Sequence, residues 1–149
     1  MSQPARSRPV KVFLDSSVIF SGLHSKHGPP AAILDRVAKG EIVAVISRRV
    51  LDEVIRTVRK KLPDALPPLN SYLRSSAFEV VEDAEQAEAD RWQGVLEPGD
   101  ADILAAALRA EPDFFVTGDK HFLHNRRLRP PGLQIVSPLE LTGKIGLPD

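Results

Sequence analysis

The sequence predicts an α/β protein, a three-layer α/β/α sandwich with a central, mainly parallel sheet. Short runs rich in β-branched and aromatic residues alternate along the chain with longer segments whose apolar residues recur at helical spacing. The short runs do not alternate polar with apolar residues, which is typical of strands buried on both faces of a parallel sheet. The 149 residues, 42% of them hydrophobic, suit one core. We therefore expect a flexible tail over residues 1–9 and a single domain over residues 10–149.

The amino-terminal part predicts one strand followed by two helices. VKVFL at residues 10–14 is a short apolar run that meets Asp15 and two serines, which is typical of a buried strand followed by a cap and a helix. That helix should include residues 18–23. A Gly-Pro-Pro break follows, and the apolar spacing of AAILDRVAKG then predicts a second helix that ends at Gly40.

The next segment repeats the order of strand and helix. IVAVI at residues 42–46 is a second buried strand, and Ser47 after it is a typical helix cap. The helix that follows has an apolar stripe along one face. This stripe comprises Val50, Leu51, Val54, Ile55, Val58 and Leu62.

The second half of the chain predicts three more strands with helices between them. EPGD separates an Ala/Glu-rich segment from a strongly helical one. The expected elements are a helix near 69–75, a strand near 78–81, helices over 84 to about 96 and 100–110, and strands over 113–117 and 133–137.

Four acidic residues stand at or near the ends of these elements. Asp15 directly follows the first strand, and Asp119 follows FFVT by one glycine. Ligand sites in parallel sheets form beyond the carboxyl ends of the strands, so both carboxylates reach one edge if their strands are neighbours. Asp100 opens a helix, and Glu53 lies more than one turn inside its helix, on the flank of the apolar stripe. Taken singly, each could be a cap, a turn residue or solvated surface.

Together, the four carboxylates would form an anionic pocket. Such a pocket repels itself unless cations fill it, and it raises carboxyl pKa values in the metal-free state. Mg²⁺ and Mn²⁺ prefer oxygen ligands. One or two such ions could orient a phosphodiester, activate a water for in-line attack and stabilise the departing oxygen. The pattern therefore predicts metal-dependent phosphate chemistry in which water is the nucleophile.

Four strings in a fixed order resemble a known family. VFLDSSVIFSGL, VLDEV, PGDADILAAAL and FFVTGDKHFL lie within residues 10–136 and resemble the PIN-domain ribonucleases, especially toxins of bacterial and archaeal toxin–antitoxin pairs. The ordered set is a more specific signature than any one string. The resemblance implies that the acidic metal-site positions of the family fall on Asp15, Glu53, Asp100 and Asp119.

The resemblance also implies accessory residues. Thr117 falls on the family's frequent Ser/Thr position, and Ser16 or Ser17 is a polar neighbour of Asp15. The family's spacing to the Ile-Leu-Ala-Ala run implies Asp100, not Asp102, as the ligand, and leaves Asp102 as a candidate in an outer supporting position. Similarity to the family implies a hydrolase, an endoribonuclease acting on single-stranded or structured RNA. It further implies an antitoxin that blocks the pocket, and homodimers.

Composition limits how such a protein holds RNA. Twenty basic and twenty acidic residues give a formal net charge of zero, so a polyanion site must be a local patch. Arg48, Arg126 and Arg127 are the candidate phosphate contacts. His121 and His124 are expected at the surface, because a site for hard metal ions does not need them.

The sequence also argues against several settings. The chain has no cysteine, which excludes disulfides, thiolate metal sites and a cysteine nucleophile. It has no run near the roughly 20 apolar residues that a spanning helix needs, so we expect a soluble, cytoplasmic protein without a membrane partner.

Other functions stay open. A nuclease of RNA maturation or quality control keeps the chemistry, whereas a non-catalytic PIN-like module would use its surface only to bind a partner. A haloacid-dehalogenase-type phosphatase, by resemblance to that family, needs a second aspartate where this chain has Ser17. A P-loop protein needs a glycine-rich phosphate loop, which is missing after every predicted strand.

Overall fold

The computed structural model describes residues 9–75, 77–128 and 130–147. Five parallel strands form one sheet in the order β3-β2-β1-β4-β5. The strands are β1 (Val10–Leu14), β2 (Ile42–Ser47), β3 (Phe78–Val81), β4 (Phe114–Val116) and β5 (Ile135–Val136). The expected three-layer α/β/α sandwich is confirmed. The tail expected over residues 1–9 lies outside the described residues except for Pro9.

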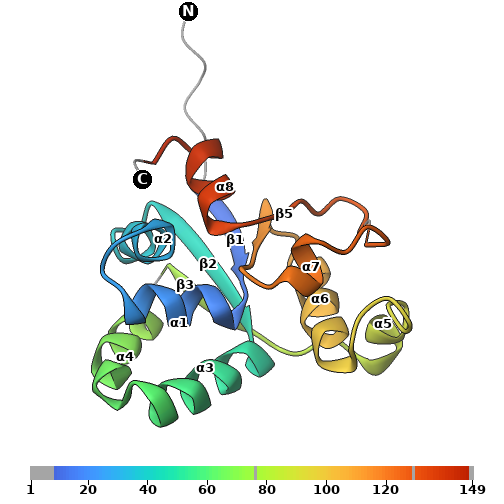
Figure 1. The fold of residues 1–149 in the computed structure, drawn as a ribbon, viewed down its shortest axis with the longest axis horizontal. Coiled ribbons are helices and arrows are strands. Elements are labelled where there is room, and N and C mark those ends of the chain that lie inside the picture. The colour runs from blue at the N-terminus through green and yellow to red at the C-terminus, as the bar shows by residue number, and fades with distance from the viewer. Residues whose placement is uncertain (1–8, 76, 129, 148–149) are drawn as a thin grey trace, which may run out of the picture.

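Helices cover both faces of the sheet. Figure 1 shows α1 to α4 on one side of the strands and α5, α6 and α7 on the other, and α8 packs against α2. The helices are α1 (Ser16–His24), α2 (Pro29–Ala38), α3 (Arg48–Lys61), α4 (Leu66–Arg74), α5 (Gln86–Asp90), α6 (Pro98–Ala110), α7 (Lys120–Leu123) and α8 (Pro138–Lys144), with a 3₁₀ turn at Pro63–Ala65. No helix within the described ranges is both long and apolar enough to cross a membrane.

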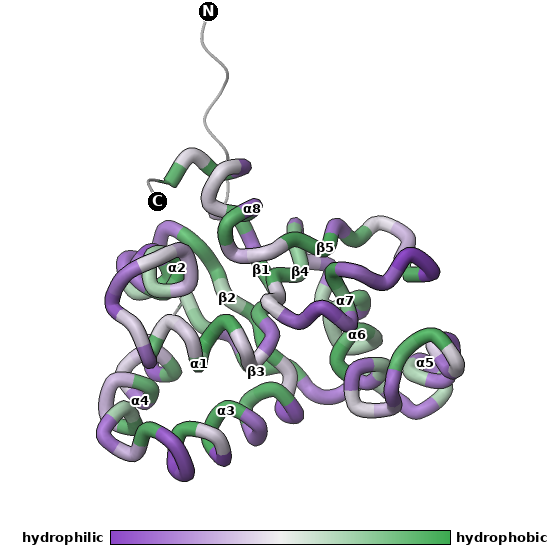
Figure 2. Tube along the Cα trace, in the orientation of Figure 1, coloured by the Kyte–Doolittle hydropathy of each residue, from purple (hydrophilic) through white to green (hydrophobic). Residues whose placement is uncertain are grey.

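The core follows from the apolar strands. Val12, Phe13 and Leu14 of β1 are fully buried, since β1 lies in the middle of the sheet. The rings of Phe13 and Phe115 meet edge to face at 5.6 Å, and Phe115 meets Phe122 of α7 at 5.0 Å. Figure 2 shows hydrophobic residues along the strands and alternating hydrophobic and hydrophilic residues along α3. These aromatic contacts hold α7 against the carboxyl end of β4.

One expected helix is much shorter in the structure. The Ala/Glu-rich segment was predicted to be helical from 84 to about 96, but α5 ends at Asp90. Gly94 has a positive φ of 79°, which favours a turn, and Trp92 and Leu96 on either side are buried. The left-handed backbone at Gly94 is incompatible with a helix that continues to residue 96, so the chain turns here.

Two short helices were not predicted. α7 begins after Asp119, whose side chain accepts from the His121 N–H. α8 begins after Ser137, which forms a capping box with Glu140. The helix expected from Asp100 begins two residues earlier, at Pro98, so Asp100 lies in its first turn and is not its cap.

Candidate metal site at the carboxyl ends of β1 and β4

Asp15 is buried at the carboxyl end of the central strand. Its side chain is held on both oxygens: Oδ1 accepts from the Ser16 N–H at 2.9 Å, and Oδ2 accepts from Thr117 Oγ1 at 2.7 Å. The Ser17 hydroxyl lies 3.5 Å from Oδ2. The Asp15 N–H donates to the Val116 carbonyl at 3.0 Å, which fixes the end of β1 against β4. The aspartate is therefore both the cap of α1 and a carboxylate fixed by the neighbouring strand.

Thr117 connects Asp15 to Asp119. It is fully buried, and its hydroxyl donates to Asp15 while accepting from the Asp119 N–H at 3.0 Å. Gly118 between them donates its N–H to Ser17 Oγ at 3.2 Å. The expectation that Asp15 and Asp119 reach one edge depended on their strands being neighbours, and β1 and β4 do pair. Thr117 thus places two carboxylates from distant parts of the chain.

Glu53 joins this edge from α3. Its Oε1 accepts from the Ser16 hydroxyl at 3.1 Å, and its Oε2 lies 3.7 Å from Arg49 Nε. Ser16 also donates its backbone N–H to Asp15, so this one residue contacts both carboxylates. The helix register therefore turns Glu53, which sequence reasoning placed on the flank of the apolar stripe, toward the end of β1.

Asp100 and Asp102 have different surroundings although both lie early in α6. Ligand atoms of Asp100, Asp119 and His121 lie within 4.8 Å of one another, a spacing that suits one ion. Asp102 instead forms an ion pair with Arg49 at 2.9 Å. Asp100 as a ligand and Asp102 in a supporting position remain predictions.

His121 lies at the surface, as expected, yet it lies beside the acidic group. The ring is exposed, but Nδ1 lies 3.0 Å from Asp119 Oδ1, and the same oxygen accepts the His121 N–H at 2.8 Å. The sequence indicates this contact only through the position of His121, two residues after Asp119. Asp119 caps α7, and the first turn of the helix brings His121 back toward the Asp119 side chain. His124, three residues on, is exposed and outside this group.

The carboxylates influence one another's protonation. Burial raises the pKa of Asp15 from its usual 3.8 to about 6, opposed by hydrogen bonds from Thr117 and Ser16 and assisted by the charges of Asp119 and Glu53. The pKa of Asp100 is also raised, first by burial and then by the charge of Asp119, with smaller contributions that include Glu53. The sequence predicted raised carboxyl pKa values, but through mutual repulsion, whereas burial is the larger cause.

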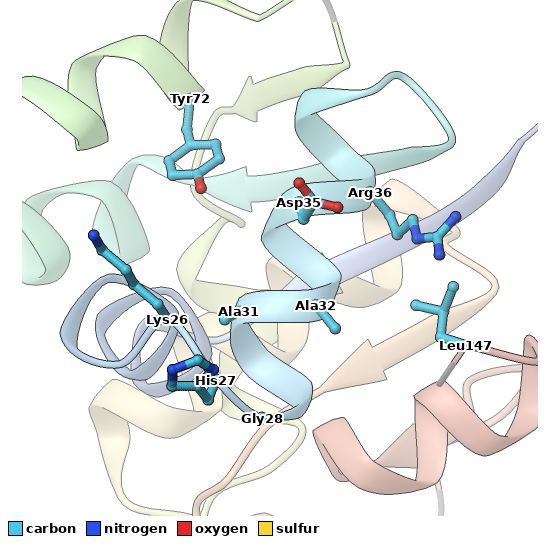
Figure 3. Close-up of a pocket in the computed structure, with 10 residues that line it drawn as sticks. Lys26, His27, Gly28, Ala31, Ala32, Asp35, Arg36, Tyr72 and Leu147 are labelled. Carbon is cyan, nitrogen blue, oxygen red and sulfur yellow. The ribbon is translucent and has the colours of Figure 1, made fainter. Parts of the chain in front are cut away.

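Pockets lie on two sides of the molecule. One of about 360 Å³ is lined by residues that include Asp100, His121 and Asn125, so it opens beside the acidic group. A larger one of about 480 Å³ lies around α2, lined by residues that include Lys26 and Tyr72 (Figure 3). The larger pocket contains none of the four carboxylates, so pocket size alone does not point to the acidic group.

The three candidate phosphate contacts lie outside the acidic group. Arg48 is exposed at the start of α3, and Arg126 and Arg127 are exposed after α7. The arginine that reaches the carboxylates is Arg49, the neighbour of Arg48. Successive side chains on a helix point about 100° apart, so Arg49 faces the carboxylates and its neighbour Arg48 does not.

The chemistry of the donors fits a divalent cation. Ligand atoms of Asp100, Asp119 and His121 lie together, and the charges of Asp119 and Glu53 act on Asp15 beside them. Hard cations such as Mg²⁺ and Mn²⁺ take oxygen ligands. Without a cation, neighbouring carboxylates repel one another, and this repulsion contributes to the raised pKa values of Asp15 and Asp100. A cation at this edge would remove it.

A family model described as a PIN domain matches residues 11–121. Among curated proteins, none matches the chain. Solved structures with a similar fold include VapBC2 from Rickettsia felis bound to a DNA fragment from the promoter, with 19% identity, a TM-score of 0.59 and coverage of 86% of this chain and 98% of that one. The PAE2754 structure from Pyrobaculum aerophilum has 18% identity and a TM-score of 0.61, over 92% of this chain and 96% of that one.

DNA-bound VapBC from Salmonella typhimurium is a further similar structure. It has 21% identity and a TM-score of 0.60, and covers 87% of this chain and 98% of that one. At these identities the likeness shows the fold.

Proposed function

The chain belongs to the PIN-domain family, and we propose that it is a metal-dependent endoribonuclease that hydrolyses RNA phosphodiester bonds with a metal-activated water. The observation that carries the proposal is the gathering of four carboxylates from separate elements. Asp15, Glu53, Asp100 and Asp119 come from the end of β1, from α3, from α6 and from the end of β4. A structural role for each would not require the others nearby.

We assign the cation to Asp100 and Asp119, with His121 within reach and with Asp15 and Glu53 completing the acidic group. One or two Mg²⁺ or Mn²⁺ ions bound there would supply Lewis acidity and lower the pKa of a bound water. The protein's own contribution is positioning. Thr117 and Ser16 hold Asp15, and the Thr117 hydroxyl also fixes the backbone of Asp119.

RNA would reach this edge along exposed basic side chains. Arg48, Arg126 and Arg127 are the proposed phosphate contacts, because they are exposed at the start of α3 and after α7, the two elements that flank the acidic group. Since the net charge is zero, such contacts give local attraction only.

The biological setting that we propose is the toxin of a toxin–antitoxin pair. Two of the similar structures are described as VapBC bound to DNA, one from Rickettsia felis and one from Salmonella typhimurium. These neighbours support a small antitoxin protein as partner, and we also propose a homodimer. A role in RNA maturation or quality control would use the same chemistry at this site.

The test is cleavage of a labelled single-stranded RNA by the purified chain with Mn²⁺ or Mg²⁺. Wild type should cleave with the metal and stop when EDTA is added. Asp119→Asn removes one ligand oxygen and should lower the cleavage rate by more than about 100-fold. The matched control is Asp52→Asn, which makes the same charge change at an exposed position of α3.

Undiminished cleavage by the Asp119→Asn protein would contradict the assignment of Asp119 as a ligand of the catalytic cation. If wild type cleaves no RNA at saturating Mn²⁺, the chain is a non-catalytic module of the family. Inhibition of wild-type cleavage by the product of a neighbouring small gene would support the toxin setting.

A further inference from the structure

Arg49 connects α3 and α6, which each contribute a carboxylate to the acidic group. From the first turn of α3, its Nη1 forms an ion pair with Asp102 Oδ2 of α6 at 2.9 Å. Its Nε lies 3.7 Å from Glu53 Oε2, one turn further along α3. A guanidinium carries five N–H donors in a fixed planar fork, so it can face two carboxylates at once.

The structure restricts where this arginine lies. The Arg49 backbone N–H donates to Asp83 Oδ1 at 2.9 Å, which fixes the first turn of α3. The guanidinium passes over Gly99 in the first turn of α6, where an added Cβ would lie 3.0 Å from Nη2. A side chain at position 99 would push the guanidinium aside, so the glycine leaves room for the bridge.

The two carboxylates in the bridge are held differently. Asp102 is within hydrogen-bonding distance of Arg49, whereas the 3.7 Å separation from Glu53 is beyond it. Glu53 Oε1 accepts from the Ser16 hydroxyl at 3.1 Å, so the carboxylate has a neighbour on each side. Because Arg49 attracts Oε2 without a hydrogen bond, this oxygen keeps its lone pairs for another partner.

We propose that Arg49, anchored by Asp102, is a positioning residue that holds Glu53 in place for the cation. This inference rests on the proposed function, since it needs a cation among the carboxylates. A long, free glutamate loses conformational entropy when it binds, and a glutamate that is already held loses less. Asp102 then serves as the anchor of the arginine, while Asp100, two residues earlier, serves the cation.

An opposite role for Arg49 makes a different prediction. A guanidinium beside a carboxylate also repels an incoming cation, so an arginine that merely neutralises the acidic group would compete with the metal. Removing a competitor tightens metal binding, whereas removing a positioning residue weakens it. The sign of the change in affinity therefore separates the two roles.

The experiment is isothermal titration of Mn²⁺ into the full chain without RNA. Arg49→Ala should weaken Mn²⁺ binding by about 10- to 100-fold, the range typical of residues that orient metal ligands. Arg59→Ala is the matched control: it makes the same charge change on the same helix, is also exposed, and should leave the affinity within about twofold. Unchanged or tighter binding in Arg49→Ala, relative to this control, overturns the proposal.

A second set of variants tests the bridge itself. Asp102→Asn should weaken Mn²⁺ binding to a similar extent, and the double variant should be no weaker than either single one, because both remove the same bridge. Arg49→Lys keeps the charge but not the fork, so it should restore only part of the affinity. Additive effects of the two single variants would contradict a shared bridge, and thermal unfolding of each variant separates loss of affinity from loss of fold.

The outcomes also separate this inference from the proposed function. If wild type binds Mn²⁺ and Asp119→Asn does not, while Arg49→Ala binds like wild type, only the role of Arg49 fails. If wild type binds no Mn²⁺, the proposed function fails together with the inference.

Discussion

Asp15 both caps α1 and contributes a carboxylate to the acidic group. The residue is 5% exposed, yet its side chain accepts hydrogen bonds on both oxygens and has acidic neighbours. Its pKa in the folded chain, about 6, is above the usual 3.8, so the folded chain binds this proton more tightly than the unfolded chain does. Stability from this group is therefore fully present below about pH 4 and is lost as the pH rises through 6.

Asp15→Asn should reverse this loss in metal-free protein. The uncharged amide avoids burying a charge, so the unfolding free energy of the variant relative to wild type should rise by about 2–3 kcal/mol between pH 4 and pH 7.5. Urea unfolding in EDTA across this range measures it, with the exposed Asp52→Asn as the control variant. A difference that stays constant with pH would contradict the raised pKa of Asp15.

Thr117 offers a test of positioning within the site. Thr117→Val keeps the shape but removes the hydroxyl that contacts Asp15 and the Asp119 N–H, which should cost about 1–2 kcal/mol of stability and weaken Mn²⁺ binding. Thr142→Val is the matched control, because Thr142 is also fully buried and donates to the Leu139 carbonyl in α8. Both variants should lose stability, and a metal affinity lowered equally in both would argue against a specific role for Thr117.

At the scale of elements, long apolar patterns were predicted well and short ones poorly. Strands such as IVAVI and the stripe of α3 were confirmed, because burial imposes their spacing over many residues. The four-residue α7 was missed because it has no room for a periodic pattern and depends on a cap at Asp119. The turn at Gly94 was missed because an isolated glycine is tolerated within a helical pattern, whereas this glycine takes a left-handed backbone conformation that ends it.

The contact between α1 and α2 gives a test at this scale. Gly22 of α1 faces Leu34 of α2, and an added Cβ would lie 2.5 Å from Leu34 Cδ1 and 3.0 Å from the Pro30 carbonyl oxygen. Gly22→Ala should therefore destabilise the chain by about 1–3 kcal/mol in urea unfolding. Gly143→Ala, in α8 with nothing within 4 Å, should instead stabilise it by about 0.5–1 kcal/mol. Destabilisation of similar size in both would show that the clash with α2 is not the cause.

At the scale of the whole molecule, the strand order brings the site together. Asp15 and Thr117 are 102 residues apart in sequence and form a hydrogen bond only because β1 pairs with β4. The sequence does not show which strands are neighbours in the sheet. The prediction that Asp15 and Asp119 reach one edge therefore depended on the pairing of their strands. The contacts of Arg49 and His121 with the carboxylates were not predicted, because they depend on how α3 faces α6 and on where α7 turns.

The central claim is that this sheet edge binds a divalent cation, and its most direct test is a crystal structure grown with Mn²⁺. We expect one or two anomalous difference peaks among the carboxylates, with Asp100 and Asp119 oxygens at about 2.0–2.2 Å from manganese. The Asp119→Asn protein under the same conditions should show no peak there. A wild-type map without a peak at this edge, or with its peak only in the pocket around α2, would contradict the account.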